Sequence, residues 1–173
     1  MGQLSLGLAL SLLFGAAQAD LPPDWKIVVS KAGGFVVAMP KNPTESKKKV
    51  ATATGHLEVF LLVALGENDA TMVVSYCDYA EEELKGNLEK RLDHARDGAV
   101  NGARGKLQSE KRAQLIDGEV LYPGRDIVIE KGGAVVARMR IFLVGRRLYQ
   151  VMALGNTSPR QAGAFMDSFR LNK

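Results

Sequence analysis

Apolar and polar residues alternate with a period of two along the first half of the chain, which is typical of β-strands that turn one face to a core. Glycine, proline and asparagine interrupt this alternation repeatedly, as they do at the turns of antiparallel hairpins. The pattern therefore predicts consecutive antiparallel strands. They occupy residues 25–29, 35–40, 47–54, 57–65 and 71–79.

Between Ala80 and Val100 the period changes from two to 3.6, which predicts an amphipathic helix. Glutamates 81 to 83 fall in its first turn, where negative charge suits the positive end of the helix dipole. Glycines 98, 102 and 105 mark its exit. The apolar residues that line its buried face are Leu84, Leu88, Leu92, Ala95 and Ala99.

A second set of strands follows this helix, separated by dipeptides that short hairpin turns require. These turns are Asp117-Gly118, Gly132-Gly133 and Gly145-Arg146. The strands occupy residues 107–115, 119–130, 134–144 and 147–154, the second of them interrupted at Pro123-Gly124. The chain then ends in a short helix, because Ser158 provides an N-cap and Pro159 suits the first helical position. Its inward-facing residues are Ala162, Phe165, Met166 and Phe169.

The last hairpin can be assigned to faces. With Gly145-Arg146 as a two-residue loop, Phe142 lies opposite Tyr149 and Arg140 opposite Val151 on one face of the sheet. The opposite face is apolar as well, with Met139, Ile141, Leu143 and Leu148 among its residues. An antiparallel sheet needs two apolar faces only when both are covered. We therefore expect an α+β fold, an α/β/α sandwich with a central, mainly antiparallel sheet and flanking helices.

The first 19 residues have the features of a signal peptide. They carry no charge, contain an apolar run from Leu4 to Phe14, and end in Ala17-Gln18-Ala19 with small residues where a signal peptidase reads. Cleavage before Asp20 leaves residues 20–173 as a single domain. We expect an exported protein, periplasmic or secreted, with no integral membrane span after cleavage, because the apolar run is too short to cross a bilayer comfortably.

Composition excludes several classes of protein without selecting an activity. The chain has 173 residues, 46 % apolar and 24 % charged, which is ordinary for a globular protein. Its net charge of +4 is too small and too interleaved to indicate nucleic-acid binding. The single cysteine, Cys77, can form no internal disulfide and is expected to be a small buried side chain in a strand.

Motifs for metals, cofactors and nucleophilic catalysis are missing from the sequence. His56 and His94 stand far from each other and from Cys77, and no zinc-ligand spacing occurs, so both are expected to be surface histidines. The glycines between Gly98 and Gly105 match no phosphate-binding motif and follow a helix instead of preceding one. We expect no catalytic residues, no metal and no cofactor.

Arg138 and Arg140 are the candidate binding residues. They share one face with Phe142 and Tyr149, and the segment 113–173 accounts for the whole positive excess of the chain. Such a pair could bind a ligand carboxylate or an acidic patch of a partner protein. The alternative is that both arginines pair with carboxylates of this chain, such as those of the helix at 81–97, or lie along the sheet as solvated stems.

Several segments resemble the PsbP-like fold family, which includes the extrinsic photosystem subunit, a Ran-binding nucleotide-release factor and secreted bacterial relatives. The resemblance lies in Trp25, the run Gly33 to Pro40, the long helix after the first strands, the hairpin Arg138 to Leu154 and the closing run Phe165 to Leu171. The chain is most similar to the secreted bacterial branch. The resemblance implies a central antiparallel sheet flanked by helices and a non-catalytic binding or assembly role.

Three functions follow from these observations. The leading hypothesis is an exported, non-catalytic binding or assembly module that recognises a protein or a small anionic ligand. The first alternative is an envelope hydrolase that uses dispersed carboxylates, since Asp78, Asp117 and Asp126 lie near predicted strand ends. The second is a purely structural envelope domain, which would have no pocket of ligand size.

Overall fold

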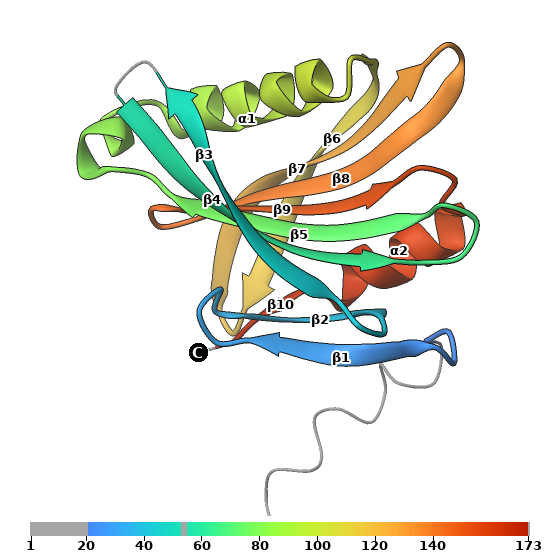
Figure 1. The fold of residues 1–173 in the computed structure, drawn as a ribbon. Helices are drawn as coiled ribbons and strands as arrows, with labels where there is room; N and C mark the ends of the chain where they lie inside the picture. Colours follow the sequence, from blue (N-terminus) through green and yellow to red (C-terminus); the bar gives the residue numbers. More distant parts are fainter. Residues whose placement is uncertain (1–20, 53–54, 173) are drawn as a thin grey trace, which may run out of the picture.

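The main sheet of the computed structural model has seven strands (Figure 1). They are β3 (Thr44–Thr52), β4 (Gly55–Leu65), β5 (Thr71–Asp78), β6 (Lys106–Asp117), β7 (Val120–Lys131), β8 (Ala134–Val144) and β9 (Arg147–Leu154). Their spatial order is β3-β4-β5-β9-β8-β7-β6, and every neighbouring pair is antiparallel. The structure describes residues 21–52 and 55–172, so the expected signal peptide lies outside the described residues.

A second sheet of three strands packs against the main sheet. It consists of β1 (Trp25–Ser30), β2 (Phe35–Pro40) and β10 (Arg170–Leu171), with β2 in the centre. Phe35 of β2 is fully buried, and its ring lies 6.2 Å from the rings of both Tyr76 and Tyr149 of the main sheet. The two sheets are therefore joined by an aromatic cluster. The sequence pattern predicts β1 and β2, whereas β10 is a pairing that only the folded chain reveals.

The first long helix begins later than predicted. A 3-10 turn, η1 (Glu81–Leu84), precedes α1 (Leu88–Gly102), and Asn87 caps the helix by accepting a hydrogen bond from the backbone amide of Glu89 at 2.8 Å. Two residues, Lys85 and Gly86, separate η1 from that cap. The glutamates at 81–83 thus lie in η1 and not in the first turn of α1, so that prediction is wrong. At the other end, Gly98 is inside the helix, which continues to Gly102.

The second helix, α2 (Pro159–Ser168), is confirmed as the sequence predicts it. Ser158 is the N-cap and its hydroxyl accepts a hydrogen bond from the amide of Gln161 at 3.2 Å. Pro159 takes the first helical position, where its missing N–H costs nothing. The inward-facing residues are buried, namely Ala162, Phe165, Met166 and Phe169.

The register of the β8–β9 hairpin is also confirmed. Phe142 pairs with Tyr149, and Arg140 pairs with Val151. Because Gly145 takes a positive φ of 60°, the two-residue turn closes as expected and fixes which side chains share a face. One face of the main sheet packs into a core with Phe142 and Val151, and the other into a second core with Met139 and Ile141.

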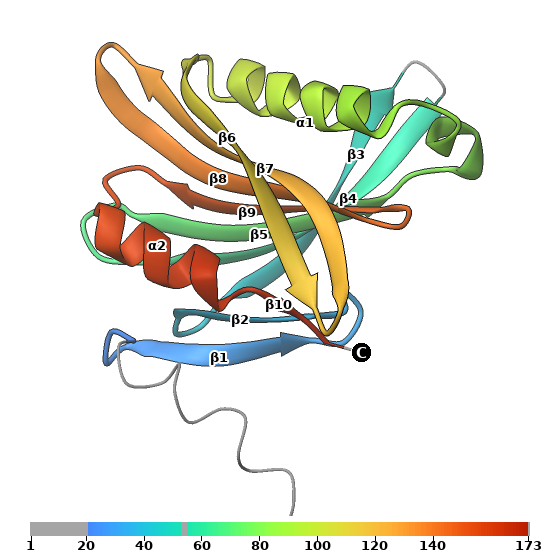
Figure 2. The same cartoon turned by 180° about the vertical axis from the view of Figure 1, so that it is seen from behind.

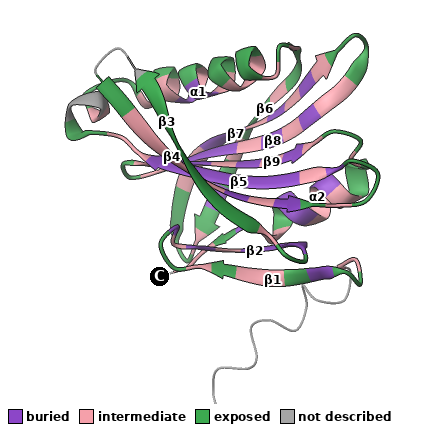
Figure 3. Ribbon diagram, viewed as in Figure 1, coloured by how far each residue is buried: buried purple, intermediate pink, exposed green. Residues whose placement is uncertain are grey.

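Different layers cover the two faces of the main sheet, as the front and back views show (Figures 1 and 2). Helix α1 covers one face and contacts β6, β7 and β8. Helix α2 covers the other and contacts β8, β9 and β2, so it shares that face with the three-stranded sheet. Over residues 21–52 and 55–172 the fold is therefore α+β, mostly antiparallel sheet with two helices, and its second covering layer is part helix and part sheet. Burial is concentrated on the central strands β5, β8 and β9 (Figure 3).

Strand β7 runs through Pro123 and Gly124 without the predicted interruption. Pairing of β7 with β8 begins at Gly124, which lies opposite Phe142, while Pro123 pairs only with Gln114 of β6. A proline is tolerated where a strand has a neighbour on one side only, because no amide donor is needed on the other side. An added Cβ on Gly124 would lie 2.3 Å from the carbonyl oxygen of Ile141, so the close approach of β8 requires glycine there.

Candidate functional site

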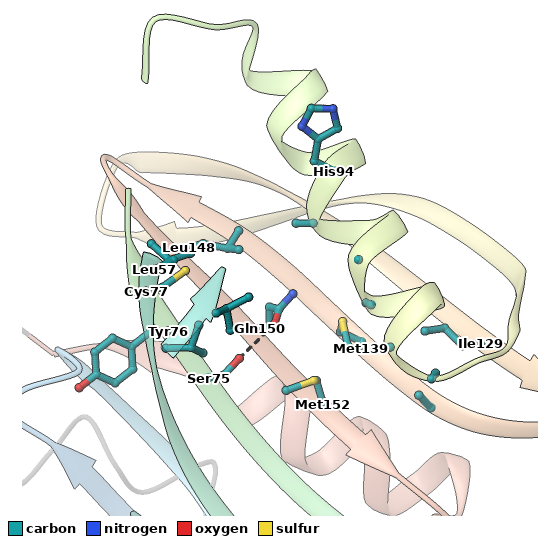
Figure 4. Close-up of a pocket in the computed structure, with 18 of the residues that line it drawn as sticks. Leu57, Ser75, Tyr76, Cys77, His94, Ile129, Met139, Leu148, Gln150 and Met152 are labelled. Carbon is teal, nitrogen blue, oxygen red and sulfur yellow. Dashed lines mark hydrogen bonds between the residues drawn. The ribbon is translucent and has the colours of Figure 1, made fainter. Parts of the chain in front are cut away.

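A cavity of about 570 Å³ lies between α1 and the main sheet (Figure 4). Its walls come from α1 on one side and from β3, β4, β5, β7, β8 and β9 on the other. The sheet contributes mainly apolar side chains, among them Leu57, Val59, Cys77, Met139, Leu148, Met152 and Leu154. A volume of this size falls in the range of small-molecule sites in proteins.

Small residues on α1 leave the space that forms this cavity. Ala95, Gly98, Ala99, Gly102 and Ala103 line it, and an added Cβ on Gly98 or Gly102 would meet no atom within 4 Å. Larger residues at these positions would close the gap between helix and sheet, because packed interiors otherwise leave few voids larger than a water molecule. The small residues in the sequence of α1 therefore account for the cavity.

Polar groups in the cavity are few and well placed. The hydroxyl of Ser75 in β5 donates a hydrogen bond of 3.1 Å to the amide oxygen of Gln150, the facing residue of β9. The side-chain nitrogen of Gln150 is turned away from Ser75 toward the cavity (Figure 4). An amide nitrogen is a hydrogen-bond donor, so the apolar cavity offers its contents an N–H group that needs an oxygen acceptor.

Two positively charged side chains, Lys48 and Arg91, lie on the elements that form the cavity. His94 contributes to the lining at an exposed position of α1, and none of the described lining residues is acidic. The register places Lys48 opposite Val59, on the cavity side of the edge strand β3. Arg91 lies four residues before Ala95, so it continues the cavity-lining side of α1 toward the start of the helix. Its Nε and Nη1 atoms are buried and have no hydrogen-bond partner among the described residues.

The two arginines proposed from the sequence have different surroundings. Arg140 donates hydrogen bonds to Asp126 at 3.0 Å and to Asp167 of α2 at 2.7 Å. Burial lowers the pKa of Arg140, but the hydrogen bonds to Asp167 and Asp126 outweigh it and raise the pKa above its usual value. Arg138 has a buried Nε atom with no hydrogen-bond partner in the described part of the chain. Arg140 also lines a smaller cavity of about 330 Å³ with Phe142 and Met166.

The carboxylates of α1 pair with arginines other than Arg138 and Arg140. Arg125 of β7 is only 8 % exposed and binds Glu89 and Glu110, the latter at 2.8 Å. Arg96 binds Glu110 as well, at 2.9 Å, and thereby connects α1 with β6. The hydrogen bond from Arg125 lowers the pKa of Glu89, against a smaller opposing effect of desolvation. This network holds α1 over β6 and β7, so it belongs to the scaffold of the cavity.

Two of the three carboxylates proposed for hydrolysis, Asp78 and Asp126, are separated in the sheet. Asp78 forms an ion pair with Arg147, and Asp126 forms one with Arg140. In the register Asp78 and Asp126 are three strands apart and four residues apart along the strands, which corresponds to about 19 Å. These two carboxylates therefore cannot act on one bond.

The single cysteine and the two histidines lie as the sequence suggests. Cys77 is buried in β5, and His56 and His94 are exposed. In the described part of the chain, no group of three His, Cys, Asp or Glu side chains is arranged to hold a metal ion. Over the same residues, no helix is both long enough and apolar enough to cross a membrane.

Comparison with solved structures identifies the fold. The solution structure of cyanobacterial PsbP (CyanoP) from Synechocystis sp. PCC 6803 matches over 91 % of this chain and 98 % of its own, with a TM-score of 0.54 and 11 % sequence identity. The chain has a PsbP-like fold. The resemblance found in the sequence is thus confirmed by the arrangement of the elements. The chain matches no protein-family model and no curated protein sequence.

Sequence reasoning missed the cavity of this PsbP-like fold, although one signal was present. The interpretation of Gly98 and Gly102 as the exit of the helix hid a stripe of small residues at helical spacing. Such a stripe marks a helix that either approaches its neighbour closely or leaves room beside it. Only the placement of α1 over the sheet decides between the two.

Proposed function

We propose that this PsbP-like chain is an exported, non-catalytic binding module and that the cavity under α1 is where it binds. The observation that carries the proposal is a preformed cavity of about 570 Å³ with an apolar wall and a hydrogen-bond donor, Gln150, inside it. Ligand sites in proteins commonly combine a largely apolar wall with a few convergent polar groups. A purely structural domain would have no reason to keep Gly98 inside its long helix, where glycine costs about 1 kcal/mol relative to alanine.

Binding without catalysis is supported by the state of two of the three candidate carboxylates. Asp78 and Asp126 are held in ion pairs with arginines, and they lie on strands far apart in the sheet. The non-catalytic role implied by the PsbP-like resemblance points the same way.

Export is proposed from the first 19 residues. Amino-terminal sequencing of the protein purified from its native cells would test it, with Asp20 as the expected first residue. A mature protein that still begins at Met1 would contradict export through this segment.

A neutral fluorescent probe tests the binding site directly. N-phenyl-1-naphthylamine becomes fluorescent in apolar surroundings, and we expect it to bind the wild-type protein saturably. Gly98→Leu places an apolar side chain in the cavity, and at Gly98 an added Cβ meets open space. The variant should weaken probe binding at least about tenfold, equivalent to about 1.4 kcal/mol.

Gly163→Leu is the matched control, since Gly163 is also a helical glycine with open space around it but lies in α2. It should bind the probe like the wild type. Saturable binding that Gly98→Leu leaves unchanged, or no saturable binding at all, would overturn the proposal for this cavity.

A second candidate function, contact with a protein partner, is favoured by the tip of the β6–β7 hairpin. Ile116 and Leu121 lie opposite each other there and are 62 % and 54 % exposed. A side-by-side pair of exposed large apolar residues is typical of a contact surface.

Retention of one specific envelope protein by the wild type, and its loss with Leu121→Lys but not with Leu65→Lys, would support this function. Leu65 is the control because it is an isolated apolar residue, 76 % exposed. Equal retention by all three proteins would exclude the tip.

Arg138 and Arg140 remain a prediction for anion recognition. The two carboxylates that hold Arg140 weigh against it, whereas the unpartnered Nε of Arg138 is compatible with a bound anion.

A further inference from the structure

We infer that the cavity under α1 takes an anionic amphiphile, a molecule with an elongated apolar chain and a head group of negatively charged oxygen atoms. The inference rests on the proposed binding function and adds to it the chemical class of the ligand. Three properties of the cavity carry it: its shape and apolar wall, the donor inside it, and the charge of the groups around it.

The shape of the cavity suits a chain. Its α1 wall runs from His94 to Ala103, which corresponds to about 14 Å along the helix axis. The facing wall is apolar across four neighbouring strands, with Leu57 of β4, Cys77 of β5, Met152 of β9 and Met139 of β8. Methionine side chains adapt to irregular apolar partners, which suits a flexible chain better than a rigid planar ring.

The donor inside the cavity selects for oxygen. The amide oxygen of Gln150 is engaged by the hydroxyl of Ser75, which leaves the amide nitrogen as the side of Gln150 that a ligand meets. A pure hydrocarbon would bury this N–H group without a partner, and that costs about 1–3 kcal/mol. A carboxylate, ester or phosphate oxygen would satisfy it.

Charge around the cavity favours a negative head group. Arg91, Ala95, Gly98 and Gly102 follow one another at spacings of four, three and four residues, so they share one side of α1. The guanidinium of Arg91 therefore belongs to the helix side that faces the cavity, one turn before its lining begins.

Two nitrogen atoms of Arg91 are buried with no partner among the described residues. Arg91 is half-buried, and donor atoms of a cation that are buried without a partner are costly, so an anion that accepts from them would be stabilised there. Lys48 adds a second positive charge on the cavity side of β3, and no acidic residue is among the described lining residues. The carboxylates of α1 that face β6 and β7, Glu89 and Asp93, are engaged by Arg125.

Three ligands with the same twelve-carbon chain test the inference. Dodecanoate, dodecanol and dodecyltrimethylammonium carry a negative, a neutral and a positive head group. Each is titrated against N-phenyl-1-naphthylamine bound to the wild-type protein, the two ionic ligands below their critical micelle concentrations and dodecanol below its solubility limit. We expect dodecanoate to displace the probe at a concentration at least about tenfold lower than dodecanol does, since a charge-assisted hydrogen bond contributes that much. The cation should be the weakest. Dodecyl phosphate in a fourth titration distinguishes a phosphate site from a carboxylate site.

Variants assign the preference to residues. Arg91→Gln should reduce the preference for dodecanoate over dodecanol to near one, while the neutral probe still binds. Lys48→Gln, at an exposed position on an edge strand, should reduce it partly and keeps the test valid if Arg91→Gln lowers stability. Arg160→Gln, an exposed position on α2, is the control and should leave the preference unchanged.

Equal displacement by dodecanoate and dodecanol in the wild type would overturn the inference and leave the proposed function intact, because the probe itself would still bind. A preference that survives both Arg91→Gln and Lys48→Gln would also overturn it. Failure of the neutral probe to bind would instead overturn the proposed function.

Discussion

Arg147 and Asp78 face each other on the neighbouring strands β9 and β5 and form a two-point ion pair. Nε of Arg147 donates to one carboxylate oxygen at 2.6 Å, and Nη2 donates to the other at 2.7 Å. The third nitrogen, Nη1, donates to the carbonyl oxygens of Ala32 and Gly33 at 3.2 and 3.1 Å. Asp78 therefore positions Arg147, which connects the β1–β2 turn to the main sheet by hydrogen bonds. Tyr149 donates a second hydrogen bond to Gly33, at 2.7 Å.

Asp78→Asn should lower the free energy of unfolding by about 1–3 kcal/mol at neutral pH, because it replaces charge-assisted hydrogen bonds by neutral ones. The hydrogen bond from Arg147 lowers the pKa of Asp78 below its usual 3.8, against the opposing effect of burial. A carboxylate whose pKa is lowered in the fold stabilises it above the unfolded pKa, and this contribution is lost as the pH falls through the folded pKa. Urea denaturation over a pH series should therefore show a constant difference above about pH 5 that shrinks below about pH 4.

Glu119→Gln serves as the control for Asp78→Asn, because Glu119 is exposed in the turn between β6 and β7 and should tolerate the change within about 0.5 kcal/mol. A difference between the wild type and Asp78→Asn that stays the same at pH 3 would show that the ion pair is not its cause.

Arg125→Met should lower the melting temperature and loosen α1, because it leaves Glu89 and Glu110 without their shared cation. The effect should decrease at high salt, where repulsion between the carboxylates is screened. Thermal denaturation at low and high ionic strength measures it. The matched control is Arg112→Met, since Arg112 lies directly opposite Arg125 on β6 and is exposed. Equal melting temperatures for the two variants would contradict this role of Arg125.

The strands were predictable where turn chemistry and alternation agree. Gly145-Arg146 closes a two-residue turn, so the pairing of Phe142 with Tyr149 follows from counting back along both strands. The start of α1 was not predictable in the same way, because three glutamates have good helix propensity and suit a first turn. Asn87 nevertheless provides the cap and begins the helix seven residues later than Ala80 suggests.

The site was less predictable than the fold. Ser75 and Gln150 are distant in the sequence, and their hydrogen bond depends on β5 pairing with β9, which turn residues do not encode. The ion pair of Arg140 with Asp167 could not be predicted from the sequence either. It forms only because α2 packs on the face of the sheet that carries Arg140. Local patterns assign faces, whereas the choice of which elements meet comes from packing of the whole chain.

Gly124→Ala and Gly98→Ala should have opposite effects on stability. An added Cβ on Gly124 would lie 2.3 Å from the carbonyl oxygen of Ile141, and backbone atoms cannot move away cheaply. We expect a loss of about 1–3 kcal/mol or more for this variant, as for overpacked cores. Gly98 is helical with open space around it, so its replacement by alanine should stabilise the protein by up to about 1 kcal/mol. Urea denaturation of both variants measures the difference, and a stable Gly124→Ala protein would contradict the close approach of β7 and β8.

Arg140→Met should lower stability without affecting ligands in the cavity under α1. Arg140 pairs with Val151, whereas the cavity is lined by the adjacent residues Met139 and Gln150, and neighbouring residues of a strand point to opposite faces. A double-mutant cycle with Asp167→Asn should give a coupling energy of about 0.2–1 kcal/mol, since Asp167 is largely exposed. This coupling should shrink as the salt concentration rises.

Displacement titrations with dodecanoate complete the test of Arg140, and the expected result is an affinity equal to that of the wild type. Weaker binding of dodecanoate to Arg140→Met, with binding of the neutral probe unchanged, would instead place the anion on the α2 side of the sheet. The candidate pair Arg138 and Arg140 would then be the binding residues, and Arg138→Gln should weaken binding in the same way. The two faces of one strand, β8, thus offer two distinct locations for an anion, and substitutions at Arg140 and Arg91 discriminate between them because each removes a charge on one face only.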